Sequence, residues 1–160
     1  MKQRYFGKGL ATAFALTLIV GEAWGQMYEP KGEAAGWLIR QKVSAISDVV
    51  ECRYVNKENP NLTIADRTLF LSTVGRRPIV FALVRFGKEP AEEWNLRTEE
   101  QKSGVIAVRE LHLARSIKAQ KLVVQINSNN GAVDEIVVDT AQLEEVQNIA
   151  KSMGCPANFL

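Results

Sequence analysis

Short β-type runs separated by turn residues recur along most of this chain, and they constrain its fold more than any other feature. Within Asp48–Val55, Val50, Cys52 and Tyr54 alternate with charged residues, the pattern of a half-buried strand whose cysteine points inward. Ile79–Phe86 is apolar on both faces until its last two residues, which predicts a central strand. Further β-type runs lie at 37–43, 69–74, 105–108, 121–127 and 132–139, with a weaker one near 94–96.

The chain changes period after its last β-type run. Asn130-Gly131 between two such runs predicts a hairpin, and Glu110–Ala119 has helical character. Leu143–Met153 then follows a helical period; Asp139 or Thr140 is its expected cap, with Gln142 completing a capping box. The predicted fold is mainly β: an antiparallel β-sandwich or curled sheet of about six to eight strands, closed by a C-terminal amphipathic helix.

The N-terminal residues have the pattern of a cleavable secretory signal. Three cationic residues precede the uncharged run Leu10–Val20, and small residues follow at Ala23 and Gly25. A membrane anchor needs about 20 apolar residues, and this run has only 11. We therefore expect residues 1–25 to be a signal peptide, 26–36 a flexible leader, and 37–160 one β-rich domain. The mature protein would be periplasmic or secreted, with no integral membrane span.

Removal of the signal peptide leaves a chain without net charge. The signal holds three of the 20 basic residues and one of the 18 acidic residues, so 17 of each remain. Without a net basic field, long-range attraction to nucleic acid is not expected.

The mature chain has two cysteines, Cys52 and Cys155. An exported protein meets an oxidising compartment, where an even number of cysteines favours a disulfide over two buried thiols. Cys155 follows the terminal helix, between Gly154 and Pro156, so the bridge would tie that helix to an early strand.

No group of residues in the sequence has the spacing of a catalytic or cofactor site. His112 is the only histidine, and its place in an apolar segment predicts a partly buried, structural role. A hydrolytic triad would need it beside Ser72, Ser103 or Ser116, none of which sits in a nucleophile elbow. Adjacent carboxylates such as Glu92–Glu93 point to opposite faces of a strand, and the glycines form no phosphate loop. We expect no enzyme activity, no metal and no cofactor.

The order and spacing of five features resemble those of a known family. They are Trp37 opening a strand, Cys52 on an early strand, an Arg-aromatic-Gly strand end followed by Pro and Trp (Arg85, Phe86, Gly87, Pro90, Trp94), a Leu-Val-Val strand (Leu122–Val124) and a terminal helix ending in Gly-Cys (Leu143–Cys155). Over residues 37–155 the chain resembles the periplasmic TagO/VasI-like proteins that accompany type VI secretion systems. The resemblance implies a non-catalytic accessory protein of the bacterial envelope with a β-sandwich.

Three functional hypotheses follow. The first is a periplasmic binding or accessory protein whose partner is an envelope or secreted protein. The second is an inhibitor that blocks a hydrolase such as lysozyme; its candidate contact loop is Gly75-Arg76-Arg77-Pro78, with Arg76 and Arg77 as the contact residues. The third is a hydrolase, which would require a cleft that converges on His112.

The signal peptide gives the first testable prediction. Cleavage after Gly25 should produce a mature protein that begins at Gln26, because small residues stand three and one positions before that bond. Intact-mass measurement of the exported protein tests this. A membrane-bound species that retains residues 1–25 would contradict it.

Overall fold

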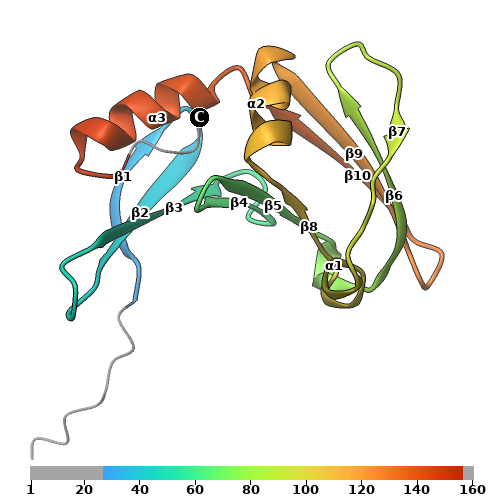
Figure 1. Cartoon of the computed structure of the whole chain (residues 1–160), viewed down its shortest axis with the longest axis horizontal. Helices are drawn as coiled ribbons and strands as arrows, with labels where there is room; N and C mark the ends of the chain where they lie inside the picture. The colour runs from blue at the N-terminus through green and yellow to red at the C-terminus, as the bar shows by residue number, and fades with distance from the viewer. Residues whose placement is uncertain (1–26, 157–160) are drawn as a thin grey trace, which may run out of the picture.

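The computed structural model describes residues 27–156, and the predicted signal peptide lies outside them. Ten strands in this part of the chain form two antiparallel sheets (Figure 1). The larger sheet has the order β1-β2-β3-β4-β5-β8. Its strands are β1 (Glu29–Ala34), β2 (Trp37–Val43), β3 (Val50–Asn56), β4 (Leu62–Ala65), β5 (Thr68–Ser72) and β8 (Val105–Val108).

The second sheet has four strands in the order β10-β9-β6-β7. These are β6 (Ile79–Phe86), β7 (Glu92–Glu93), β9 (Lys121–Ser128) and β10 (Val133–Asp139). The chain enters this sheet after β5, returns to the larger sheet at β8, and comes back for β9 and β10. Because the chain passes between the sheets three times, both sheets belong to one folding unit.

Helices connect and cover the sheets. They are α1 (Thr98–Ser103), α2 (Glu110–Lys118) and α3 (Leu143–Ser152), with one 3-10 turn at Val74–Arg76. α1 contacts β6 and β8, α2 contacts β5 and β9, and α3 contacts β1. In Figure 1, α3 lies over the β1–β2 end of the larger sheet, and α2 lies between the two sheets.

A single hydrophobic core joins the sheets and helices. On the larger sheet, a cross-strand row of buried residues runs through five strands in register: Ile39, Tyr54, Ile64, Leu69 and Val108. Phe86, Leu122 and Val124 on the second sheet and Leu143 and Val146 on α3 belong to the same core. Because successive side chains along a strand point to opposite faces of the sheet, one face of each sheet packs on this core.

The predicted fold class is confirmed: residues 27–156 are mainly β and form two antiparallel sheets, neither closed into a barrel, with a C-terminal helix. The bounds of three strands, Trp37–Val43, Ile79–Phe86 and Val105–Val108, match the predicted runs. The Asn-Gly hairpin is also present. Gly131 there has φ +79°, and its N–H donates to the carbonyl of Ser128 at 3.0 Å.

Two strands were absent from the prediction. Residues 29–34, predicted to belong to a flexible leader, instead pair with β2 as strand β1. An edge strand tolerates Pro30. A Cβ at Gly32 would lie 2.5 Å from Cε of Met153, just beyond the end of α3, so the methionine side chain would have to move. Strand β4 follows the predicted turn at 56–61, and its pairing with β3 depends on contacts that a local pattern does not contain. The short strand expected near 94–96 is instead β7, at Glu92–Glu93.

Two further local predictions were wrong. β6 lies between β9 and β7, as the predicted central position requires, but burial of both its faces was not found: Val80 and Phe81 are exposed, and β7 pairs only with Leu83 and Val84. The α3 cap also differs, since Gln142 precedes the helix without a side-chain hydrogen bond. The hydroxyl of Thr140 instead donates to the buried carbonyl of Ser116, and Asp139 accepts from the N–H of Ala141.

Substitutions at two glycines test how tightly the end of α1, at Gly104, packs against Arg76 and Arg77. Gly104 and Gly131 both have positive φ, at +67° and +79°, so alanine at either position costs about 1–2 kcal/mol of backbone strain. A Cβ at Gly104 would lie 2.5 Å from the carbonyl oxygen of Arg77, whereas a Cβ at Gly131 meets nothing within 4 Å. Gly104→Ala should therefore lower the unfolding free energy by about 1–3 kcal/mol more than Gly131→Ala. Urea unfolding of both variants measures this difference, and equal losses would contradict the packing described here.

Candidate functional site

A disulfide joins Cys52 on β3 to Cys155, three residues beyond the end of α3, with 5.8 Å between the two Cα atoms. The predicted pairing is confirmed, and the bond indicates a protein of an oxidising compartment. The residues that end α3 place Cys155 next to β3. Gly154 adopts φ +83°, and the N–H of Cys155 donates to the carbonyl of Ala150 at 3.0 Å, as in a Schellman motif. Cys155 is thereby turned back toward the sheet.

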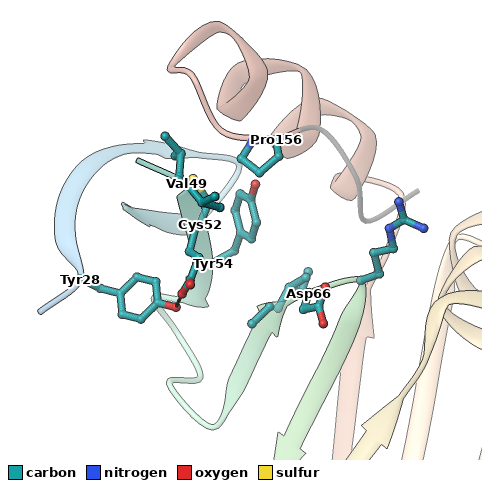
Figure 2. A pocket seen from close by; sticks show the side chains of 11 residues that line it. Tyr28, Val49, Cys52, Tyr54, Asp66 and Pro156 are labelled. Carbon is teal, nitrogen blue, oxygen red and sulfur yellow. Dashed lines mark hydrogen bonds between the residues drawn. The ribbon is translucent and has the colours of Figure 1, made fainter. Parts of the chain in front are cut away.

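A hollow in the described part of the molecule lies beside this disulfide (Figure 2). β2 pairs with β3 along its whole length, but β4 pairs only with Arg53–Val55 and then ends at Ala65. Val50–Cys52 therefore have no neighbouring strand on that side, and a space of about 650 Å³ opens there. We call it the disulfide hollow; it is lined by Tyr28, Val49, Val50, Glu51, Cys52, Tyr54, Ile64, Ala65, Asp66, Arg67 and Pro156.

The disulfide hollow has an apolar floor and a polar rim. Tyr54, Cys52 and Ile64 belong to the core or pack against it, and Figure 2 shows Tyr54 extending toward Pro156. Burial raises the pKa of Tyr54 to about 12, so its hydroxyl is neutral at physiological pH. Asp66, on the β4–β5 turn, is exposed and makes no ion pair with any described residue.

Tyr28 forms the opposite part of the rim and is fixed by its neighbours. Its hydroxyl donates to Oε2 of Glu51 at 3.0 Å, and the guanidinium of Arg53 lies 4.6 Å from the ring centroid. Burial, followed by the hydrogen bond to Glu51, raises the pKa of Tyr28. This contact was not predicted, because Tyr28 lies in the segment expected to be a flexible leader.

The β2–β3 hairpin beside the disulfide hollow exposes apolar side chains. Ile46 at its tip is 99% exposed, and Val43 and Val49 are about half exposed. Val49 also lines the disulfide hollow, so the exposed apolar surface and the hollow are continuous. Clustered apolar exposure of this kind is typical of interaction surfaces.

A second, smaller hollow of about 400 Å³ contains His112. It shares no lining residue with the disulfide hollow; its lining is Glu92, Glu93, Trp94, Asn95, Arg97, Glu100, Ala107, Arg109 and His112. The predicted burial of His112 was wrong. The buried face of α2 is formed by Leu113, Ser116 and Ile117, which leaves His112 exposed, with its ring edge-on to Trp94 at 4.7 Å.

None of the serines considered for a triad lines the hollow at His112. Ser116 is fully buried, and its hydroxyl donates to the carbonyl of Leu113. The hydroxyl of Ser103 is directed to the carbonyl of Glu100, and Ser72 lies on β5. The carboxylate of Glu100 is occupied as well, since it accepts backbone N–H groups from Arg97 and Ala107. This hollow therefore lacks a serine nucleophile.

Arg76 and Arg77 have different surroundings. Arg77 is only partly exposed and makes an ion pair with Asp134 on β10 at 2.8 Å, so it links the loop to the second sheet. Arg76 is exposed, with φ +51°. Of the two predicted contact residues, Arg76 is therefore the one that a partner can reach without breaking an internal ion pair.

Residues 27–156 contain no group of three or more histidine, cysteine, aspartate or glutamate side chains arranged to hold a metal ion. Within the same residues, no helix has both the length and the apolar character needed to cross a membrane.

The disulfide gives a stability prediction. Its loop of 103 residues corresponds to about 4.7 kcal/mol in the chain-entropy treatment. Cys52→Ser and Cys155→Ser should each lower the unfolding free energy by about 2–5 kcal/mol, and α3 should be the first element cut by protease. The double variant should lose little more than either single variant, since the bond is already absent. Additive losses in urea unfolding would contradict a shared bond.

Comparison with known proteins gave no relative: no family model matches the chain, and neither does any curated protein or solved structure.

Proposed function

We propose that this chain is an exported, non-catalytic binding protein of the bacterial envelope, an accessory to a larger assembly such as a secretion system. Its partner is an envelope or secreted protein, which it contacts at the disulfide hollow and the adjacent β2–β3 hairpin. The observation that carries the proposal is the disulfide hollow itself, a rigid recess of about 650 Å³ with an apolar floor and a polar rim.

The construction of the disulfide hollow suits binding. Both of its walls are tied together, since Cys52 lies on β3 and Cys155 precedes Pro156 on the opposite wall. A rigid recess loses little conformational entropy when it is filled, which favours affinity. An apolar centre with charged groups at its edge is also the usual anatomy of a protein interface.

The chemistry of the lining residues favours binding over catalysis. Glu51 is engaged by the Tyr28 hydroxyl, and Arg67 is paired with Glu110 at 3.2 Å. Histidine is the side chain best suited to general-base catalysis near neutral pH. The single histidine of the chain lies in the other hollow.

Location in the periplasm is part of the proposal. The disulfide requires an oxidising compartment, and the pattern of residues 1–25 is that of a secretory signal. The resemblance of residues 37–155 to the TagO/VasI-like proteins supports the same location and an accessory role.

Site-specific photocrosslinking in living cells tests the binding surface. A photoreactive phenylalanine at Val49 or Asp66, both exposed on the rim, should give a discrete adduct with a partner protein. The same group at Lys102, exposed on α1 outside this hollow, is the matched control and should give none. Equal adducts at all three positions would contradict a specific site.

A second variant separates binding from catalysis. His112→Gln should leave the Val49 adduct and any cellular phenotype unchanged, because His112 lies outside the disulfide hollow. If His112→Gln instead abolished a measured turnover while circular dichroism and the melting temperature stayed the same, the protein would be a hydrolase and the proposal would fail.

A further inference from the structure

Strand β10 forms an open edge of the four-stranded sheet. Its seven residues pair with β9 in continuous register, without a bulge, and no strand of the described chain pairs with its other side. An unpaired strand edge presents a row of backbone N–H and C=O groups that can accept another strand. Val133, Glu135, Val137 and Asp139 are all exposed along it.

The other described edges are protected in ways that β10 is not. β1 carries Pro30 and a register shift between Pro30 and Gly32, and β7 has only two residues. β8 is short, and the N–H of Ala107 is already bonded to the Glu100 carboxylate at 3.0 Å. Proline, bulges, short length, charged side chains and covering groups are the usual means of preventing strand addition. β10 has seven residues with no proline and no bulge, and its charged side chains are all acidic, with no lysine or arginine.

The side chains of β10 define what could pair with it. Val133 and Val137 are 56% and 51% exposed on the face of the sheet that points away from the core. On the same face, Val133 aligns through Asn127 with Phe81, which is 40% exposed. Glu135 lies between the two valines and makes no ion pair with any described residue. Valine and acid therefore alternate along this face as Val133, Glu135, Val137 and Asp139.

We propose that β10 is a docking edge for an extended segment of another protein, which adds to the sheet as an antiparallel strand. On the face that continues Val133–Asp139, every second residue of the complementary segment is alternately apolar or β-branched and basic. Its apolar residues lie beside Val133 and Val137, and its basic residues lie beside Glu135 and Asp139. Backbone hydrogen bonds supply the affinity, and this alternation supplies the specificity.

Charge favours a basic partner over a second copy of this chain. Antiparallel pairing of β10 with itself would bring together two strands that each carry Asp134, Glu135 and Asp139 and no basic residue. Like charges on adjacent strands are destabilising, whereas opposite charges stabilise the pair. This docking edge is separate from the disulfide hollow, so it stands or falls independently of the proposed function.

Peptide binding to the mature protein tests the proposal. The probe is a nine-residue peptide in which valine and lysine alternate at every second position, with threonine between them. In NMR titration, the amide signals of Val133–Asp139 should shift the most. A peptide with glutamate in place of lysine should bind roughly tenfold more weakly, since two favourable charge pairs become repulsive.

Two matched changes separate strand addition from simple charge attraction. Glu135→Lys should weaken binding of the lysine peptide, while Glu144→Lys, the same charge change on the exposed face of α3, should leave it unchanged. Two further peptides carry N-methyl groups on alternate amides, one at the odd positions and the other at the even positions. One of them should lose binding and the other should keep it, because only every second amide of an added strand faces β10.

Three results would overturn the proposal. The first is peptide binding that shifts amide signals elsewhere but not on β10. The second is binding that both N-methylated peptides lose equally, or that both retain. The third is concentration-dependent dimerisation of the mature protein with protection of the β10 amides, which would assign the edge to a second copy. Unchanged melting temperatures show that the variants remain folded.

Discussion

The covalent bond between Cys52 and Cys155 fixes the part of the structure on which the candidate site depends. Helix α3 contacts the edge strand β1, and Gly32 leaves room there for Met153. The disulfide joins the end of that helix to β3, two strands further into the sheet. The wall formed by Pro156 and the wall formed by β3 are therefore linked through this bond, and the disulfide hollow lies between them.

Both proposed contact surfaces arise where strand pairing stops. β4 ends before it can cover Val50–Cys52, which opens the disulfide hollow, and no strand within residues 27–156 pairs with the outer side of β10. Unpaired backbone at a sheet edge is costly to bury and prone to unwanted association, so its persistence at a long, unprotected strand calls for an explanation. Binding by extended segments of other proteins is a function that uses such backbone directly.

The candidate site was only partly predictable. The disulfide followed from two cysteines in a chain with a predicted signal peptide, and the Schellman end of α3 followed from Gly154 before Cys155. Tyr28 and Asp66 were missed because nothing in their local sequence marks them. Tyr28 reaches the rim through pairing of β1 with β2, and Asp66 through the point at which β4 ends. Arg77 was considered a contact residue, yet a residue 57 positions away in the chain, Asp134, holds it in an ion pair.

The sequence by itself determined the local structure: the alternating strands, the Asn-Gly hairpin, the helix over 143–152 and the pairing of the two cysteines. These features depend on residues close in the chain or, for the disulfide, on there being only one possible pair. The tertiary structure alone decided that residues 29–34 join the sheet, that Val80 and Phe81 stay exposed, and that β3 and β10 keep bare edges. These outcomes depend on which distant segments pack together, and the local pattern of residues does not contain that information.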